Sequence, residues 1–523
     1  MPTAQVRKKS TISRGVIEEN SRARRAIGAY NLIDGEWKAS SSGESFTNIN
    51  PATGETLGAW PKSTEAEFNA AVVAAKRSYD SWRKTPAPRR AEILLAAYQI
   101  LVNRKEELAR VMTQEMGKVL KETRGDVQEA IDTALYYAGE GRRLFGKTTT
   151  SELPDKFAMT CRMPVGVCGL ITPWNFPMAI PSWKLFPALL CGNTVILKPA
   201  SDTPASATLL AEVLQEAGLP KGVLNLIHGP GSTVGNWMVH HPDIRLISFT
   251  GSSGIGSGIA AECGRLFKKV SLEMGGKNAQ IVLDDADLDL AVEGAIWGAF
   301  GTTGQRCTAT SRLIVHEAVY NSFVKKFLER AAALRLGNGL DAKSEVGPMV
   351  NRSGQEKVAE YVEIGLKEDR AKLLLGGHPA RDGTLARGFF FEPTVFEARP
   401  EMRISREEIF GPVVALIKVK SFDEAIAVLN NTDYGLSGSV YTRDVNRALQ
   451  AIRDMETGIT YINAPTIGAE VHLPFGGVKQ TGNGHREAAE TALDIFTDWK
   501  AVYIDYSGKL QKAQIDTEPK EGQ

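Results

Sequence analysis

The stretch NTVILKPASDTPASATLLAEVLQEAGLPKGVLNLI, residues 193–227, contains the alternation that predicts the fold. Its two ends, NTVILK (193–198) and VLNLI (223–227), are short apolar runs typical of buried strands. Between them, ASATLLAEVLQEAGLP (205–220) has apolar residues at helical spacing and helix-stop signals at Gly218 and Pro220. A strand, a helix and a strand in succession predict an α/β fold with a parallel, doubly wound sheet covered by helices.

The flanking sequence extends this pattern. The apolar runs VGVCGLI (165–171) and IRLISF (244–249) predict two more strands, and a second α/β region begins near 281 with IVLDDADLDLAVEGAIWGAF. The chain has 523 residues, which is too long for one hydrophobic core. We therefore expect two or three domains.

Composition excludes several classes of protein. The 62 basic and 61 acidic residues nearly cancel, so we expect no general attraction to nucleic acid or to an anionic membrane. Five cysteines without a CxxC pair, and no HExxH motif, argue against disulfides and against a metal site. Cysteines used in this way favour a reducing compartment, and we expect a cytoplasmic protein.

Three segments need separate interpretation. Residues 165–183 carry no charge, but their prolines would break a membrane-spanning helix, so a buried strand followed by a turn is expected. Residues 1–29 are rich in Arg and Lys and predict a loose N-terminal arm, because Glu18 and Glu19 fit a cleaved presequence poorly. The polar tail 509–523 is expected to be loose as well.

The segment FGTTGQRCTATSR (300–312) carries the strongest chemical signal. Its Cys307 stands alone in a Gly/Thr-rich stretch and is a candidate nucleophile, although free cysteines are more often small buried hydrophobic residues. Upstream, SLEMGGK contains Glu273 and TPWNFP contains Asn175. A thiol, a carboxylate and an amide in such loops fit a nucleophile, an acid/base and an oxyanion donor.

The whole pattern resembles the aldehyde dehydrogenase superfamily. The matching segments follow one another in the order of that family: TPWNFP (172–177), ILKPASDTP (196–204), ISFTGS (247–252), LEMGGKN (272–278), GQRC (304–307), EEIFGPV (407–413) and PFGGVK (474–479). The resemblance implies a Rossmann-type cofactor domain, an α/β catalytic domain and a bridging β-structure that joins subunits into a homodimer or homotetramer. By this resemblance the three parts comprise 30–148 with 164–280, then 281–470, and 149–163 with 494–508.

The resemblance also implies a reaction. Cys307 attacks the aldehyde, Asn175 and the backbone N–H of Cys307 hold the oxyanion, and a thioester forms after hydride transfer to NAD or NADP. Glu273 then activates water, so a carboxylic acid is the expected product. Two functions of other classes are alternatives to aldehyde oxidation. A non-enzymatic protein on this scaffold should have lost Cys307 or Glu273, and a serine hydrolase should carry a GxSxG motif, which is missing here.

Cofactor residues follow from the same resemblance. The string GRRLFGKT (141–148) matches a phosphate-binding loop, but the text before it has helical periodicity, so we interpret the match as chance. Ser201 stands where the family often has a glutamate, which puts strict NAD preference in doubt and favours NADP or dual use. The residues assigned to the cofactor are Thr172, Pro173, Trp174, Lys198, Ser201, Gly251, Ser252, Glu408 and Phe410.

Substrate choice is predicted from the segment PTIGAEVHLPFGG (465–477). It is most similar to α-ketoglutarate semialdehyde dehydrogenases and to broad-range bacterial relatives. Trp183 stands where succinate semialdehyde dehydrogenases commonly have an arginine, so a tunnel lined by Trp183 and Phe186 predicts a broad range that includes uncharged aldehydes. The alternative is a dedicated α-ketoglutarate semialdehyde dehydrogenase. Any preference for acidic substrates is expected to come from His472 or from backbone amides of 465–473.

Overall fold

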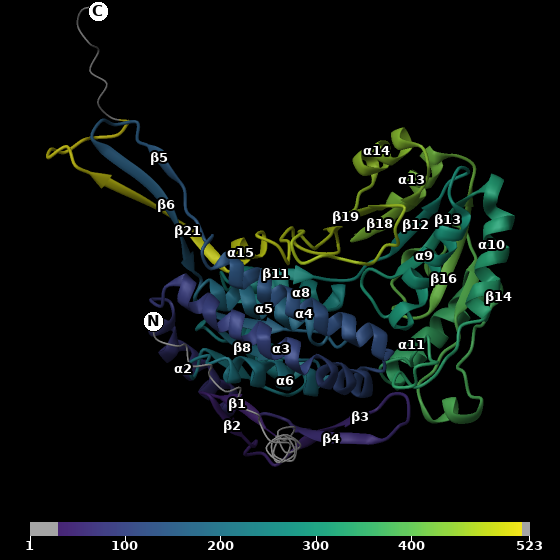
Figure 1. Ribbon diagram of the computed structural model, residues 1–523, viewed down its shortest axis with the longest axis horizontal. Coiled ribbons are helices and arrows are strands. Elements are labelled where there is room, and N and C mark those ends of the chain that lie inside the picture. The colour runs from purple at the N-terminus through teal and green to yellow at the C-terminus, as the bar shows by residue number, and fades with distance from the viewer. Residues whose placement is uncertain (1–29, 515–523) are drawn as a thin grey trace, which may run out of the picture.

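The computed structural model describes residues 30–514, and two large sheets organise them (Figure 1). Both sheets are mainly parallel and are covered by helices, so the predicted α/β class is confirmed. The predictions for the 1–29 arm and for residues 515–523 of the tail lie outside the described residues.

The first sheet contains the strands predicted from the apolar runs between residues 165 and 249. Five consecutive strands, from one edge of the sheet inward, are parallel, and two strands in antiparallel pairing close the other edge. The predicted helix over 205–220 is also present, as α6 (Pro204–Glu216). In sheet order the strands are β11 (Lys269–Glu273), β10 (Ile244–Thr250), β7 (Val167–Ile171), β8 (Thr194–Lys198), β9 (Leu224–Leu226), β1 (Asn31–Ile33) and β2 (Glu36–Lys38).

Both faces of this sheet are buried, which explains why its strands are continuous apolar runs. On β7, Cys168 and Leu170 pack into one core, whereas Val167 and Ile171 pack into another on the opposite face. The first core includes α6 and the helices α3 (Ala87–Met116), α4 (Leu120–Glu140), α5 (Ala179–Leu190) and α15 (Ala492–Ile495). The second includes α2 (Glu65–Trp82), α7 (Asn236–His240) and α8 (Ser253–Arg265).

The second sheet follows the same plan. Only its edge strand β14 is antiparallel. In sheet order the strands are β14 (Lys372–Leu375), β15 (Thr394–Glu397), β16 (Val413–Val419), β13 (Thr310–His316), β12 (Asn278–Val282), β18 (Ser437–Tyr441) and β19 (Ile459–Ile462). Its helices are α9 (Leu288–Phe300), α10 (Glu317–Ala332), α11 (Arg352–Glu363), α12 (Arg403–Arg406), α13 (Phe422–Asn430) and α14 (Val445–Asp454).

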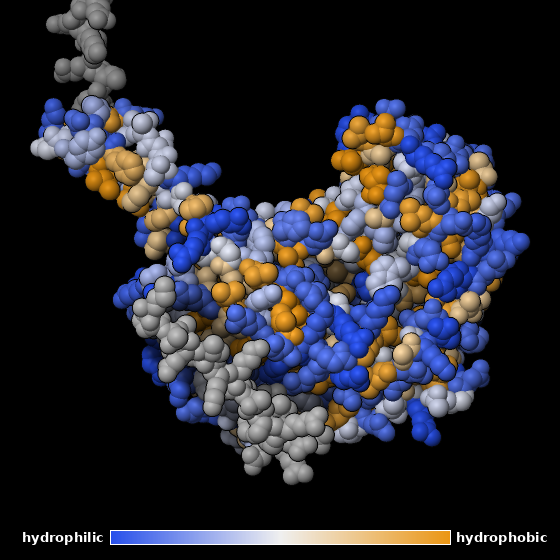
Figure 2. Space-filling model, viewed as in Figure 1, coloured by the Kyte–Doolittle hydropathy of each residue, from blue (hydrophilic) through white to orange (hydrophobic). Residues whose placement is uncertain are grey.

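A three-stranded antiparallel sheet projects from the body of the molecule (Figure 1). It consists of β5 (Thr148–Thr150), β6 (Lys156–Pro164) and β21 (Thr497–Asp505). Several large apolar or aromatic side chains on it are exposed; they include Phe157, Trp499, Tyr503 and Ile504. Figure 2 shows hydrophobic residues, in orange, on the surface of this projecting sheet. The remaining strands form two antiparallel pairs: β3 (Ser45–Ile49) with β4 (Thr56–Pro61), and β17 (Tyr434–Gly435) with β20 (Val478–Lys479).

Two stretches of the sequence that allowed more than one interpretation, 165–183 and 141–148, have defined structures. The uncharged run 165–183 forms β7, a turn and the start of α5, as expected. Across residues 30–514, no helix combines the length and the apolar character needed to cross a membrane. The GRRLFGKT string begins at the end of α4 and leads into β5, so it lacks the strand–loop–helix context of a phosphate-binding loop.

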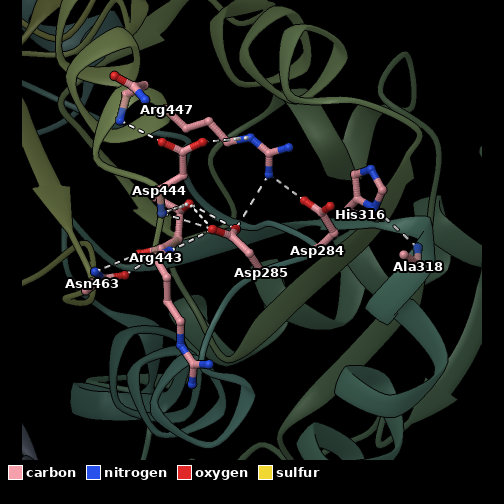
Figure 3. Close-up of polar contacts among 10 residues, drawn as sticks. Asp284, Asp285, His316, Ala318, Arg443, Asp444, Arg447 and Asn463 are labelled. Atoms are coloured by element: carbon pink, nitrogen blue, oxygen red, sulfur yellow. Dashed lines mark hydrogen bonds and ion pairs between the residues drawn. The ribbon is translucent and has the colours of Figure 1, made fainter.

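One carboxylate fixes the carboxyl edge of the second sheet (Figure 3). Asp285, just after β12, accepts hydrogen bonds from the Thr442 hydroxyl at 2.8 Å and from the backbone N–H groups of Arg443 and Asp444 at 2.9 and 3.0 Å. Asp444 in turn caps α14. This network sets the position of α14 against β12, because Asp285 is the acceptor for the Arg443 N–H and shares the Asp444 N–H with the Thr442 hydroxyl.

We predict that Asp285→Ala lowers the free energy of unfolding by about 1–3 kcal/mol, since it leaves the Thr442 hydroxyl and the Arg443 N–H without their acceptor. Asp284→Ala is the matched control: it removes only a partly exposed ion pair with Arg447 and should cost about 0–1 kcal/mol. Thermal and denaturant unfolding of both variants measure the difference. Equal losses would show that Asp285 contributes no more than a surface ion pair.

Candidate active site

The loop that carries Cys307 has an unusual backbone. It follows α9 directly, and Thr302, Thr303 and Gly304 all have positive φ angles of 54°, 58° and 69°. Positive φ is strained for β-branched residues, and such strain persists only when the surroundings enforce it. The turn brings Cys307 back toward the first sheet.

A buried carboxylate enforces this conformation. Glu122 of α4 accepts the backbone N–H of Thr302 at 2.7 Å and the Arg306 guanidinium at 3.3 Å. Arg306 Nε also donates to the Thr302 hydroxyl at 2.9 Å, which closes the network. The Gln305 amide is held on the other side, where its Oε1 accepts the Val350 N–H at 2.9 Å. The loop is therefore clamped from two directions.

Asn175 is held against the backbone segment that leads to Cys307, and both residues line one cavity. The Asn175 amide donates to the Gln305 carbonyl at 3.2 Å, two residues before the thiol, and the Cys307 carbonyl accepts from Asn278 at 2.7 Å. Burial, together with the nearby charges of Glu273 and Glu408, raises the pKa of Cys307 to about 12. The thiol is thus protonated at neutral pH.

Glu273 ends β11 in a dry environment. Its two carboxyl oxygens are buried and have no hydrogen-bond partner among residues 30–514. Burial raises the pKa of Glu273 well above its ordinary value, with a further contribution from the nearby charge of Glu487. Lys184 forms an ion pair with Glu487 and donates to Ser248 at 2.8 Å. Glu273 is therefore a weaker acid, and its carboxylate a stronger base, than an exposed glutamate.

Two cavities meet at Cys307. The smaller has a volume of about 120 Å³ and is lined by Cys307, Glu273 and Trp183, whose ring lies 4.8 Å from that of Phe475. The larger has a volume of about 260 Å³ and reaches Cys307 from the other side. Because the thiol lies at their junction, molecules bound in the two cavities can both reach it.

The structure places several predicted cofactor residues in the larger cavity. Trp174 and Phe410 form an edge-to-face pair with ring centroids 5.4 Å apart. The Glu408 carboxylate accepts the Gly276 N–H at 2.9 Å, and burial raises its pKa. The other predicted residues that line the cavity are Pro173, Asn175, Gly251 and Ser252. Thr172 is buried behind them, and its backbone N–H donates to the Lys198 carbonyl.

The environment fits a dinucleotide. Ser252 begins α8 without a side-chain cap, so the N-terminal N–H groups of this helix remain available to phosphate oxygens. Between α7 and α8 lies a further groove of about 410 Å³. Lys198 lies beside Gly235, which lines this groove. Its ammonium group donates to the carbonyls of Pro199 and Gly229 at 2.8 and 3.3 Å. Burial lowers the pKa of Lys198 to about 8. Ser201 is half-buried in the turn before α6.

Two residues assigned to the substrate lie elsewhere. His472 is exposed and ion-paired with Glu470 at 3.5 Å, and it does not line the cavity around Cys307. Phe186 is fully buried in the core between α5 and its neighbouring helices. His472 lies in an exposed loop, and Phe186 lies one helical turn after Trp183 and packs into the helical core, so neither lines the thiol's cavity.

Sequence reasoning missed several residues of the site. Glu122 and Glu129 come from α4, where isolated acidic residues look like a solvated helix face. Arg306 directly precedes Cys307 in the GQRC motif, and this position next to the thiol could have indicated a role in the site. Glu487 and Lys184 form a buried ion pair across 303 residues of sequence, for which no local pattern exists.

Comparisons with known proteins agree with this geometry. The profile of the aldehyde dehydrogenase family matches residues 37–502. An α-ketoglutaric semialdehyde dehydrogenase of Bacillus subtilis is 42% identical over 476 residues, covering 91% of this chain and 97% of that protein. An α-ketoglutarate semialdehyde dehydrogenase of Haloferax volcanii is 44% identical over 479 residues, covering 91% and 99%.

A solved structure resembles the whole described chain. Betaine aldehyde dehydrogenase from Staphylococcus aureus, in complex with NAD+, superimposes with a TM-score of 0.91 at 34% identity, and the match covers 94% of this chain and 97% of that one. The family profile spans most of the sequence, and the relatives match over nearly their full length. The chain therefore belongs to the aldehyde dehydrogenase family and is an oxidoreductase that uses NAD or NADP.

Proposed function

We propose that the protein oxidises a broad range of aldehydes to carboxylic acids through a covalent intermediate on Cys307. The observation that carries this proposal is the position of the thiol at the junction of two cavities, beside a buried carboxyl group and an amide. The larger cavity fits a nicotinamide and the smaller an aldehyde. Cys307, Glu273 and Asn175 are the proposed catalytic residues.

The first half of the reaction forms a bond between sulfur and carbon. The Cys307 thiol must lose its proton before it attacks, and Glu273 is the nearby group proposed to assist. The oxyanion that forms accepts hydrogen bonds from the Asn175 amide and the Cys307 N–H. A nicotinamide bound beside Glu408 and Phe410 would supply the acceptor for the hydride that leaves the substrate carbon. A thioester remains on Cys307.

The second half releases the acid. Glu273 takes a proton from a water molecule, which attacks the thioester carbonyl and returns Cys307 to its thiol form. A base with a raised pKa suits this task, because it binds the proton firmly once it has received it. The apolar walls around Glu273 restrict access to other water molecules.

The cofactor assignments extend the proposal. Glu408 and Phe410 would hold the nicotinamide end, Gly251 and Ser252 the diphosphate, and Lys198 and Ser201 the adenosine ribose. A hydroxyl at Ser201 leaves room for a 2′-phosphate, which a carboxylate would repel, so NADP or dual use is favoured. Thr172, Pro173 and Trp174 would complete the wall beside the nicotinamide.

The assembly and its location also belong to this proposal. Residues 30–148 with 164–280 would bind the dinucleotide, 281–470 would supply the thiol, and 149–163 with 494–508 would join subunits. The exposed apolar side chains of the projecting sheet support a homodimer or homotetramer, since such patches are usually covered. The near balance of charge and the unpaired cysteines support a cytoplasmic location.

The runner-up is an enzyme dedicated to α-ketoglutarate semialdehyde. The similarity to two such dehydrogenases at 42% and 44% identity supports it. Trp183 and Phe475 support the broad range, because an apolar cavity discriminates weakly between similar aldehydes. Oxidation of hexanal within about a hundredfold of the best semialdehyde would favour the broad range.

Removal of the thiol tests the proposed function. We expect Cys307→Ala to abolish NAD(P)H formation with every aldehyde while cofactor binding stays nearly intact, because covalent catalysis has no substitute here. Absorbance of the reduced cofactor and equilibrium binding of the oxidised cofactor measure the two effects. Turnover above about one-thousandth of the parent rate would refute Cys307 as the nucleophile.

Glu273→Gln should separate the two halves of the reaction. Hydrolysis of the thioester needs a base for water, so we expect deacylation to slow more than hydride transfer. Stopped-flow absorbance should show a burst of reduced cofactor followed by slow turnover. If the burst itself slows equally, Glu273 acts mainly in activating Cys307.

The Glu122 clamp should affect catalysis without touching the substrate. We expect Glu122→Ala to lower kcat about 100-fold, since release of the strained turn misplaces the thiol, whereas KM for the cofactor changes little. Glu122→Gln keeps an acceptor for the Thr302 N–H and should lose less. Glu106→Gln, which alters only exposed ion pairs, is the control. Equal kcat in all three variants would show that the clamp is dispensable.

A further inference from the structure

We propose that Asp202 and Asn351 are positioning residues for the cofactor, and that the hydrogen bond between them ties the adenosine end of the site to the part of the molecule built on the second sheet. The inference rests on the proposed function, which assigns Lys198 and Ser201 to the adenosine ribose. Asn351 Nδ2 donates to Asp202 Oδ1 at 2.8 Å, across 149 residues of sequence. Neither residue was assigned to the cofactor from the sequence.

Asp202 lies in the turn that carries the proposed adenosine residues. This turn, residues 199–203, connects β8 with α6 and includes Ser201. Its first carbonyl, that of Pro199, accepts the Lys198 ammonium at 2.8 Å. A displacement of the turn therefore moves both the Ser201 hydroxyl and a carbonyl that orients Lys198.

The Asn351 side chain serves two partners at once. Its Oδ1 accepts the Gly354 N–H at 2.8 Å and so caps α11. Because a backbone N–H can only donate, the amide oxygen must face α11, and the amide NH2 group faces the Asp202 carboxylate. Burial raises the pKa of Asp202, whereas the hydrogen bond from Asn351 acts in the opposite direction. The bond thus favours the ionised form of Asp202.

Asn351 is a fixed point for the turn. The preceding residue, Val350, donates its N–H to Gln305 Oε1 at 2.9 Å, and Gln305 Nε2 donates to the Pro348 carbonyl at 3.2 Å. Gln305 belongs to the clamped loop before Cys307. The segment 348–351 is therefore held in place whether or not Asp202 is present, so the hydrogen bond restrains the turn rather than its anchor.

Other contacts support the turn from different directions. The Glu115 carboxylate of α3 accepts the N–H groups of Ala205 and Ser206 at 2.9 and 2.8 Å, which fixes the start of α6. Asn48 of β3 donates to the Asp202 carbonyl at 2.7 Å. These contacts hold the backbone, whereas the bond to the Asp202 carboxylate adds a support from the second sheet. Its loss should loosen the turn without unfolding it.

The same asparagine also reaches the nicotinamide end. Gly354 and Lys357 of α11 line the cavity of about 260 Å³, and Lys357 Nζ donates to the Glu408 carbonyl at 3.0 Å. The two ends of the cofactor site are therefore fixed relative to each other before the cofactor binds. Without the bond to Asp202, the turn must become ordered during binding, which weakens the affinity. The thiol and its loop keep their own supports.

A matched pair of variants tests this in the full-length protein with hexanal as the aldehyde. Asp202→Ala and Asp202→Asn both remove one negative charge near an anionic cofactor, so charge alone would lower KM for NAD and NADP in both. Asp202→Asn keeps an acceptor for Asn351. We expect Asp202→Ala to raise both KM values about 10-fold, because a charged hydrogen bond and its ordering are lost. Asp202→Asn should stay within about twofold of the parent, with kcat little changed in both.

A polarity swap locates the effect in the contact between the two side chains. Asn351→Asp keeps a cap for α11 but sets two carboxylates against each other, so KM for the cofactor should rise about 10-fold or more. In the double variant Asn351→Asp with Asp202→Asn, the new amide can donate to the new carboxylate, and the net charge equals that of the parent. We expect this variant to recover KM to within about threefold of the parent.

The outcomes separate this inference from the proposed function. An unchanged or lowered KM in Asp202→Ala overturns the positioning role, as does a double variant that binds the cofactor no better than Asn351→Asp. A fall in kcat with unchanged KM overturns it too. Absence of aldehyde oxidation in the parent overturns the proposed function instead. Thermal unfolding of each variant checks the fold, and the swap remains decisive if Asp202→Ala folds poorly.

Discussion

The hydrogen bonds that Glu122 accepts from the turn before Cys307 are the constraint on which the site depends. Two threonines in left-handed conformation are unfavourable by themselves, and they persist because a buried carboxylate takes the Thr302 N–H and the Arg306 guanidinium together. Glu122 belongs to a helix of the first sheet, whereas the turn follows a helix of the second. The reactive geometry therefore exists only when the two parts of the molecule pack against each other.

Burial gives the site its electrostatic character. The same desolvation raises the pKa values of Cys307, Glu273, Glu408 and Glu129, although these groups come from four different elements. In such surroundings one charge has a large effect on its neighbours, as Glu487 has on Glu273. Catalysis and cofactor binding are thus coupled through protonation, and a change at one group alters the others.

The sequence predicted the fold where one local rule was sufficient. The apolar runs that became β7, β8, β9 and β10 are buried on both faces, so they read as strands whatever surrounds them. Cys307, Glu273 and Asn175 stood out because each lies in a Gly- or Pro-marked motif. Glu129 gave no such signal, because an acidic residue on an amphipathic helix usually faces solvent. His472 was misplaced for the opposite reason: its motif was informative, but the loop turns the side chain to the surface.

The sequence by itself determined the α/β class, the family resemblance and the candidate nucleophile, base and oxyanion donor. These follow from periodicity and from residues that are close together in the chain. Tertiary structure alone decided that Arg306 is held between Glu122 and the cavity, that Lys184 pairs with Glu487, and that Glu129 faces the thiol's cavity. Such contacts join residues far apart in sequence, and their energies depend on burial. Burial exists only after the two sheets and their helices have packed together.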